Sequence, residues 1–98
     1  MENTQEEIII SFNKRESRSV ALNSGNIIGY CQYTEQDNVW SITHTVVKQE
    51  FSGRGIAKRL VLTIIDEARK QNKKINPICS YVKKMMESSD EYKDVLNQ

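Results

Sequence analysis

Residues 39–68 read VWSITHTVVKQEFSGRGIAKRLVLTIIDEA, and the spacing of apolar residues changes within this stretch. From Val39 to Val47, β-branched and aromatic residues dominate, which is typical of a strand. From Ile56 to Ala68, apolar residues recur at steps of three and four, which predicts a helix of about 15 residues or more. A strand that leads into such a helix favours a crossover to a parallel neighbouring strand.

The sequence before residue 39 predicts three further strands, at residues 8–12, 19–22 and 27–33. Asn23-Ser24-Gly25-Asn26 reads as a turn between two of them, because Gly25 and Asn26 tolerate positive φ. Short connections of this kind favour an antiparallel meander.

The sequence after the long helix predicts a short strand. Asn72 tolerates the left-handed conformation that ends a helix, so Gln71-Asn72 is the expected C-terminus. A strand at residues 74–78 follows, and Pro77 within it has no amide to donate to a central ladder. Residues 39–78 are therefore expected to form the strand, helix and strand of the crossover.

The last residues predict two short helices. The first covers residues 80–87, and Ser88 with Glu91 then matches a capping box that opens a helix through Leu96. The predicted fold class is α+β: an antiparallel meander, a strand-helix-strand crossover and short C-terminal helices.

Composition is that of a soluble globular domain. The chain has 98 residues, a net charge of +1, 38% hydrophobic and 28% charged residues, so we expect a single domain over residues 1–98. The longest apolar run, residues 60–65, is far too short to span a membrane. The polar, acidic residues 1–7 do not resemble a secretory leader, so we expect a cytoplasmic protein.

The sequence holds two cysteines and one histidine. Cys31 and Cys79 form neither a disulfide framework nor a CxxC pair, and one histidine cannot complete a four-ligand site, so we expect reduced thiols and no metal. Strict alternation places His44 and Val46 on the same face as Trp40 and Ile42, the more apolar face of the strand. Cys31 and Trp40 are expected in the core.

Two glycines, Gly53 and Gly55, stand where the long helix begins. Helix amides have no partner there and bind anions, and glycine lets a ligand approach the backbone closely. Residues 54–74 carry seven basic and two acidic side chains, so this segment has a charge of +5 and the rest of the chain −4. A solvated helix face is the alternative interpretation, but with the glycine loop we favour a phosphate or diphosphate ligand.

Two nucleotide-binding motifs fit poorly. The chain has no GxxxxGK[ST] sequence, and Lys58 stands where a dinucleotide GxGxxG motif needs its third glycine. Nucleic acid is also disfavoured as a partner, because only Phe51 offers an aromatic ring of the phenylalanine or tryptophan type near the basic segment.

The loop resembles that of the GNAT acetyltransferase superfamily, Q/R-x-x-G-x-G/A, with Glu50 where the pattern prefers Gln or Arg. Residues 43–96 resemble more specifically its small YjdJ-type branch. The matching motifs are His44-Thr45-Val46-Val47, Gly53-Arg54-Gly55-Ile56-Ala57, Pro77-Ile78-Cys79 and Glu91-Tyr92. The chain departs from that branch at Ser89-Asp90, where His-Pro is frequent.

This resemblance implies that the chain binds acetyl-CoA, with pantetheine between the fourth and fifth strands. The residues implied in cofactor binding are Val46 and Val47 beside the thioester and the loop residues Phe51, Ser52, Gly53, Arg54, Gly55, Ile56 and Ala57. His44 stands where a base acts in many members, and histidine titrates close to neutral pH. Cys79 is a candidate acyl acceptor and Tyr81 a candidate acid for the leaving thiolate.

Bland alternatives remain for two of these residues: His44 as a satisfied core residue and Cys79 as a small buried hydrophobe. The predicted function is N-acetyl transfer to an unknown amine, peptide or protein acceptor. The alternative is a module that binds or senses acetyl-CoA without turnover. Residues 13–16 are too short for the helices that follow the first strand in longer superfamily members, so the acceptor side is expected to be open or completed by another protein.

Overall fold

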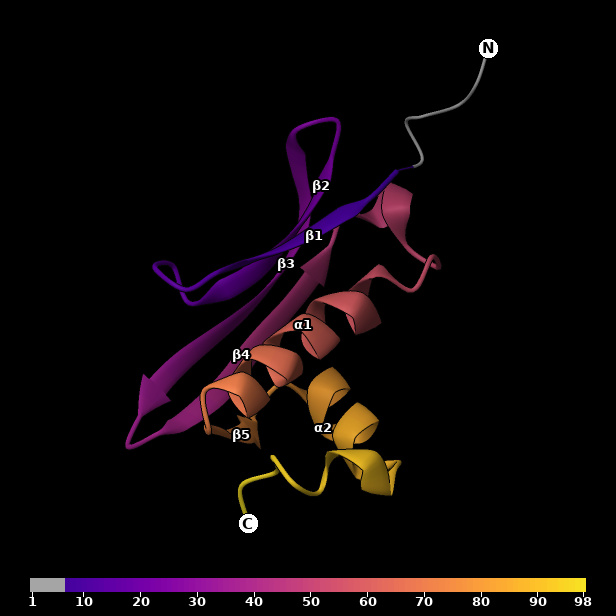
Figure 1. The fold of residues 1–98 in the computed structure, drawn as a ribbon. Helices are drawn as coiled ribbons and strands as arrows, with labels where there is room; N and C mark the ends of the chain where they lie inside the picture. The colour runs from indigo at the N-terminus through magenta and orange to yellow at the C-terminus, as the bar shows by residue number, and fades with distance from the viewer. Residues whose placement is uncertain (1–6) are drawn as a thin grey trace.

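The computed structural model describes residues 7–98 and contains one five-stranded sheet with strand order β1-β2-β3-β4-β5 (Figure 1). The first four strands pair antiparallel and β5 is parallel to β4. The strands are β1 (Ile9–Asn13), β2 (Arg18–Asn23), β3 (Asn26–Gln36), β4 (Val39–Val47) and β5 (Lys74–Pro77). The predicted α+β meander with a β4-helix-β5 crossover is confirmed. The polar start, apart from Glu7, lies outside the described residues.

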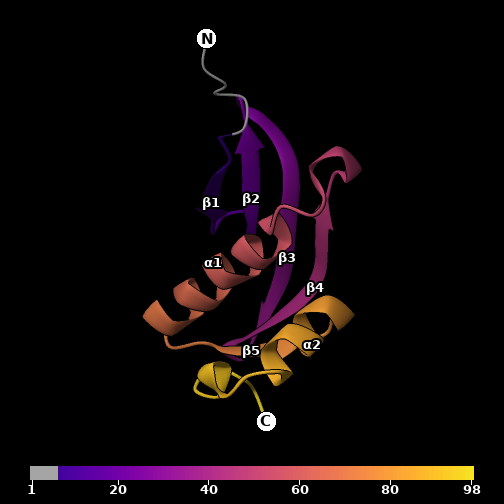
Figure 2. The same ribbon diagram turned by 90° about the vertical axis from the view of Figure 1, so that its right-hand side faces the viewer.

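Helix α1 (Ile56–Lys70) contacts all five strands and lies across one face of the sheet, which Figures 1 and 2 show from two sides. Its predicted apolar side is buried, and it ends as expected, with Asn72 in the left-handed conformation at φ 59°. Ser19 on β2 donates its hydroxyl to the Leu60 carbonyl at 2.9 Å, which ties the helix to the sheet. The rings of Trp40 and Tyr33 stack with centroids 4.2 Å apart in the core, where Trp40 was expected.

We call the side of the sheet that α1 covers the core face and the other side the open face. Side chains of directly paired residues share a face. Ser19 pairs with Cys31, and Cys31 pairs with Thr45, so this row lies on the core face with Ser19. The next row, Arg18, Gln32 and His44, therefore lies on the open face.

A β-bulge in β4 changes which residues face the core. Tyr33 pairs with Ile42, but Gln32 pairs with His44, so Thr43 is an extra residue in β4. Trp40 and Ile42 are fully buried before the bulge, whereas His44 is exposed and Val46 is 43% exposed after it. The prediction that His44 and Val46 share a face with Trp40 and Ile42 is wrong, because strict alternation does not survive the extra residue.

Two local predictions also need correction. The β2–β3 turn has positive φ at Ser24 and Gly25, not at Gly25 and Asn26, since the two central residues lie one position earlier. The final capping residue is Ser89 rather than Ser88: its hydroxyl accepts from the Glu91 amide at 3.2 Å. It caps a 3-10 turn, η3 (Asp90–Tyr92), instead of a helix through Leu96.

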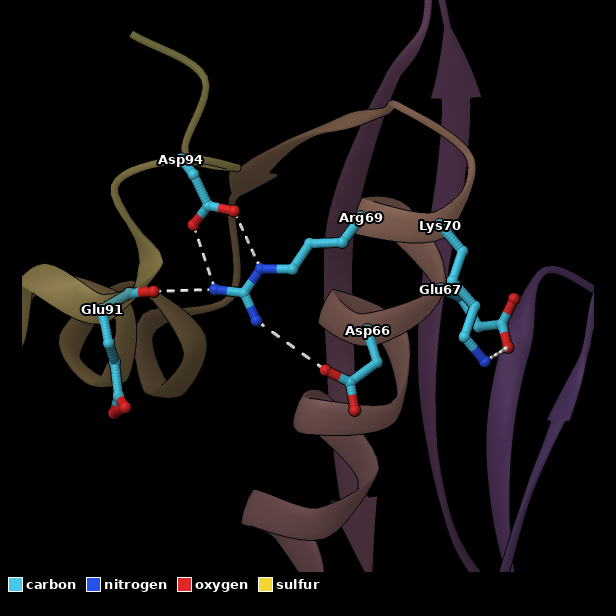
Figure 3. A network of polar contacts seen from close by, with 6 residues as sticks. All are labelled: Asp66, Glu67, Arg69, Lys70, Glu91 and Asp94. Carbon is cyan, nitrogen blue, oxygen red and sulfur yellow. Dashed lines mark hydrogen bonds and ion pairs between the residues drawn. The ribbon is translucent and has the colours of Figure 1, made fainter.

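The C-terminal segment closes the outer edge of β5. The Ile75 amide donates to the Val95 carbonyl at 2.6 Å, and the Asn97 amide donates to the Ile75 carbonyl at 2.8 Å. Arg69 at the end of α1 holds this segment from outside: its guanidinium binds both carboxylate oxygens of Asp94, at 2.9 and 3.0 Å, and the Glu91 carbonyl at 2.7 Å (Figure 3). Backbone hydrogen bonds thus attach residues 90–97 to β5, and the Arg69 side chain attaches them to α1.

Helix α2 (Ser80–Glu87) forms as predicted and packs against β4, β5 and η3, with Val82 and Met86 buried. Among residues 7–98, no helix is both long and apolar enough to cross a bilayer.

Candidate functional site

The loop between β4 and α1 is shaped by two glycines with positive φ. A 3-10 turn, η2 (Gln49–Phe51), follows β4, and the chain then passes through Gly53 at φ 79° and Gly55 at φ 75°. Gly55 is the N-cap of α1, and no atom lies within 4 Å of a Cβ built at either glycine. The loop backbone is therefore exposed to solvent on the side where a ligand would approach.

The amides of this loop fall into two groups. Those of Phe51 and Ser52 donate to the Lys48 and Gln49 carbonyls at 2.9 and 3.0 Å, so they are occupied. In the described part of the chain, no protein acceptor is recorded for the amides at the start of α1, which belong to Gly53, Gly55, Ile56, Ala57 and Lys58. The amides left without a protein acceptor among the described residues thus begin at Gly53 rather than at Phe51.

A pocket of about 230 Å³ opens beside these amides. Its lining includes Val47 from β4 and Tyr81 from the first turn of α2, and the loop contributes Phe51, Ser52, Gly53, Gly55, Ile56, Ala57 and Lys58. The Arg54 guanidinium lies over the Phe51 ring, 5.3 Å from its centroid. The structure therefore brings Tyr81 to the glycine loop, although Tyr81 lies 26 positions after Gly55 in the sequence.

Strands β4 and β5 part beside this pocket. Their pairing ends at Ile42 and Pro77, where the Ile42 carbonyl accepts the amides of both Ile78 and Cys79, at 3.1 and 2.9 Å. Beyond this point β4 continues to Val47 while the chain after Pro77 turns into α2. The edge of β4 that faces away from β3 is therefore unpaired from Thr43 onward, as expected for strands that splay.

Cys79 lies at the opening and is the N-cap of α2. Its thiol donates to the Thr45 hydroxyl, with the sulfur 3.8 Å from Oγ1. The pKa of Cys79 lies below its ordinary value: burial raises it, but the amide of Val82, the Thr45 hydroxyl and the amides of Tyr81 and Thr45 lower it more. The side chain makes no capping hydrogen bond within ordinary geometry, so the α2 amides act on it chiefly as nearby dipoles.

Tyr81 neighbours Cys79 as well as the loop. Burial, and then the charge of Cys79, raise the pKa of the Tyr81 phenol, which keeps its proton at neutral pH. The hydroxyl is thus available as a proton donor in the pocket.

His44 stands apart from these groups. It is exposed on the open face, and its Nδ1 lies 3.0 Å from the hydroxyl of Thr43, the bulge residue. Cys79 reaches β4 through Thr45 on the core face, so the structure does not bring His44 and Cys79 together in one contact. The interpretation of His44 as a core residue is wrong, because the bulge turns its ring outward.

The basic segment is divided between the two ends of α1. Arg69 in the last turn of α1 binds Asp94, and Lys73, beyond the end of the helix, binds Glu35 at 2.6 Å. At the start of α1, Arg59 donates to the Ile8 carbonyl at 3.2 Å. The net charge of the segment therefore overstates the field at the loop, where the amides are the stronger indication of an anion site.

Thr45 is a site residue that sequence reasoning did not single out. It contacts both cysteines, since Cys31 Sγ lies 3.6 Å and Cys79 Sγ 3.8 Å from its Oγ1. The available signal was its place in the His-Thr-Val-Val motif, but strict alternation hid its orientation. Within residues 7–98, no group of three or more His, Cys, Asp or Glu side chains is arranged to hold a metal ion.

A family model described as GCN5-related N-acetyl-transferase matches residues 18–95. The NMR structure of a GCN5-like protein from Staphylococcus aureus is 30% identical, covers 94% of this chain and 90% of its own, and superposes with a TM-score of 0.74. No curated protein sequence matches the chain.

Two longer proteins share part of the fold. A GCN5-related N-acetyltransferase from Sphaerobacter thermophilus is 25% identical over 63% of this chain and 21% of that chain, with a TM-score of 0.60. The GNAT family N-acetyltransferase YhbS from Escherichia coli, in complex with CoA, is 20% identical over 61% of this chain and 38% of that chain, with a TM-score of 0.57. This chain therefore spans well under half of either protein.

Proposed function

Because this chain belongs to the GCN5-related N-acetyltransferase family, we propose that it binds acetyl-CoA at the glycine loop and transfers the acetyl group to an amine. Family membership confirms the superfamily predicted from the loop and strand motifs, and the fold of the Staphylococcus aureus neighbour agrees with it. The observation that carries the proposal is the set of loop and first-turn amides, those of Gly53, Gly55, Ile56, Ala57 and Lys58, that have no protein acceptor within residues 7–98.

These amides suit the diphosphate of CoA. The donors at Gly53, Gly55, Ile56, Ala57 and Lys58 have no acceptor recorded within the described chain, and the helix dipole adds partial positive charge at the same place. The likeness of fold to a protein that holds CoA supports this ligand. Phe51 and Ser52 then border the diphosphate through their side chains, since their amides are occupied. Arg54 lies between the two loop glycines and borders it through its side chain as well.

Pantetheine follows the opening between β4 and β5, as the resemblance implies. Val47 lines the loop pocket, and Val46 lies next to it on the open face, so the two residues flank a thioester placed between the strands. A thioester in this position is accessible from both faces of the sheet: His44 lies on the open face and Cys79 on the core face.

In direct transfer, His44 takes a proton from the acceptor ammonium on the open face. The neutral amine attacks the thioester carbonyl carbon, the bond from that carbon to the CoA sulfur breaks, and Tyr81 gives its proton to the departing thiolate. The new amide nitrogen loses its second proton to solvent. The phenolate then recovers a proton from solvent. The acceptor approaches an uncovered sheet face, which fits an amine carried by a molecule larger than the pocket.

In the cysteine route, the Cys79 thiolate attacks the same carbon and CoA departs as before. The acceptor amine then attacks the acetyl-cysteine, whose carbon–sulfur bond breaks to restore the thiol. Mass spectrometry after incubation with acetyl-CoA tests this route by locating an acetyl group on Cys79, and a Cys79→Ala variant with full turnover would exclude it.

Binding at the loop is tested by comparing Gly55→Ala with Gly25→Ala. Both glycines have positive φ, 75° and 81°, and both have open space where Cβ would lie, so the two changes impose the same kind of backbone strain. We expect Gly55→Ala to weaken acetyl-CoA binding by about tenfold or more and Gly25→Ala to leave it nearly unchanged. Calorimetric titration gives both affinities, and equal affinities would contradict the loop site.

A second function, binding or sensing of acetyl-CoA without turnover, shares the same loop. CoA release measured with a panel of amines and peptides separates it from catalysis. Loss of release in His44→Ala with binding retained supports the enzyme. If acetyl-CoA binds and no thiol appears with any acceptor, the sensing function is favoured.

A further inference from the structure

Thr45 stands between the only two cysteines of the chain. Its Oγ1 lies 3.6 Å from the sulfur of Cys31 and 3.8 Å from the sulfur of Cys79. Cys31 is fully buried on β3, whereas Cys79 is partly exposed at the start of α2. The hydroxyl therefore links a buried thiol to the thiol at the opening between β4 and β5.

This arrangement depends on the bulge. Because Thr43 is an extra residue, Thr45 turns to the core face and pairs with Cys31. Because β4 and β5 stop pairing at Ile42 and Pro77, the chain brings Cys79 alongside the unpaired edge of β4. Without the bulge, the side chain at position 45 would point to the open face and contact neither sulfur.

The hydrogen-bonding capacities of the three groups determine how they respond to ionisation. A hydroxyl has one proton to donate and two lone pairs to accept. Burial, partly offset by the Thr45 hydrogen bond, raises the pKa of Cys31 to about 11, so this thiol keeps its proton and can donate to Oγ1. The Thr45 proton is then free to rotate toward Cys79 whenever that sulfur is negatively charged.

We propose that Thr45 is a positioning residue that holds the Cys79 thiolate, donating its hydroxyl proton to that sulfur while the buried Cys31 thiol donates to Thr45. When Cys79 loses its proton to solvent, the Thr45 hydroxyl reverses its role from acceptor to donor, and the S–H bond of Cys79 is the only covalent bond of the protein that breaks. The proposal rests on the proposed function only in placing Cys79 beside the reacting thioester. The state of the thiol itself is measurable without acetyl-CoA.

Two titratable neighbours interact electrostatically with Cys79. Cys31 faces Cys79 from β3 and Tyr81 faces it from α2, and in both cases the charge of Cys79 raises the neighbour's pKa. Lys58 at the start of α1 lines the pocket that Tyr81 also lines, and His44 of β4 points to the open face. Substitutions at Thr45 leave these groups in place.

The test is the pH profile of Cys79 alkylation by iodoacetamide, read by peptide mass spectrometry so that Cys31 is followed separately. Thr45→Val keeps the shape of the side chain but removes the hydroxyl. We expect its profile to move to higher pH and the alkylation rate at pH 7 to fall roughly three- to tenfold. Thr45→Ser should restore the profile, and Cys31→Ala should shift it in the same direction as Thr45→Val by a smaller amount.

Thr63→Val is the matched control, because the Thr63 hydroxyl on α1 donates to the Arg59 carbonyl rather than contacting a cysteine. A Thr45→Val profile that coincides with that of Thr63→Val overturns the proposal, as does a Thr45→Ser profile like that of Thr45→Val. Should Thr45→Val fail to fold, the decision passes to Thr45→Ser and Cys31→Ala: a wild-type profile for Cys31→Ala then overturns the two-donor arrangement. Failure of acetyl transfer alone changes none of these profiles.

Discussion

Gly29 on β3 packs closely against the backbone at the end of β4. A Cβ at this position would stand 2.8 Å from the Val46 carbonyl oxygen and 3.3 Å from a Val47 methyl. The absence of a side chain thus permits the close approach that sets the end of β4 beside the loop.

Gly29→Ala should accordingly displace the β4 backbone and destabilise the fold by about 1–3 kcal/mol, as overpacking usually does. Denaturant unfolding measures the loss, and Ser11→Ala on the exposed side of β1 serves as the control. We also expect shifted amide resonances at Val46 and Val47. A variant with unchanged stability would show that β3 and β4 can separate at no cost.

Glu50 is exposed in η2, one turn before the loop glycines. Its negative charge opposes a diphosphate nearby, and it replaces the Gln or Arg of the family motif. Glu50→Gln should therefore tighten acetyl-CoA binding by roughly two- to fivefold, an effect that fades as added salt screens the charge. Glu87→Gln at the end of α2 is the control in calorimetric titrations, and an equal gain in that variant would rule out a local effect.

At the scale of elements, the end of α1 and the C-terminal segment depend on Arg69. Its guanidinium binds Asp94 and the Glu91 carbonyl, while Lys74 Nζ donates to the Asp94 carbonyl at 2.6 Å. Arg69→Gln should speed hydrogen exchange of the amides of Ile75 and Asn97, which close the edge of β5. Arg18→Gln, which removes an ion pair with Glu16, should leave both exchange rates unchanged.

The pH dependence of this contact has a definite sign. The hydrogen bond from Arg69 lowers the pKa of Asp94 below its ordinary value of 3.8. A carboxyl group whose pKa is lowered in the folded state stabilises the fold at pH values above its unfolded-state pKa. This stability is lost as the pH falls through its folded-state pKa. The difference in exchange between wild type and Arg69→Gln should therefore be full above pH 5 and shrink as the pH falls below about 3.8. A difference in exchange rate that persists at low pH would show that the Asp94 carboxylate does not cause it.

Periodicity predicted the elements well where one pattern persists along a segment. The bounds of α1 follow from the apolar spacing of Ile56 to Ala68, and Asn72 ends the helix as its tolerance of positive φ suggests. The last turn was less predictable, because Ser88 and Ser89 offer equivalent capping side chains, and in the structure the Ser88 hydroxyl donates to the Met85 carbonyl while Ser89 caps the turn. The faces of His44 and Thr45 could not be predicted, since an extra residue in a strand has no signature in its hydrophobic pattern.

At the scale of the whole molecule, ligand binding and folding are coupled. Acetyl-CoA that binds only the native state should stabilise it by about 2.7 kcal/mol at a hundredfold excess over Kd, a rise in Tm of roughly 10 °C or more. Acetyl-pantetheine, which lacks the diphosphate, should give a much smaller rise at the same concentration. Thermal unfolding measures both shifts in Tm, and equal shifts would show that the loop amides do not contribute to the affinity for acetyl-CoA.

The extra residue in β4, Thr43, reverses which of the alternating side chains face the core. Before Thr43, the even-numbered residues Trp40 and Ile42 are buried on the core face. After Thr43, the even-numbered residues His44 and Val46 lie on the open face. Deleting Thr43 would remove the bulge and still leave His44 opposite Gln32 and Thr45 opposite Cys31, so the strand would become regular while both faces keep their present side chains.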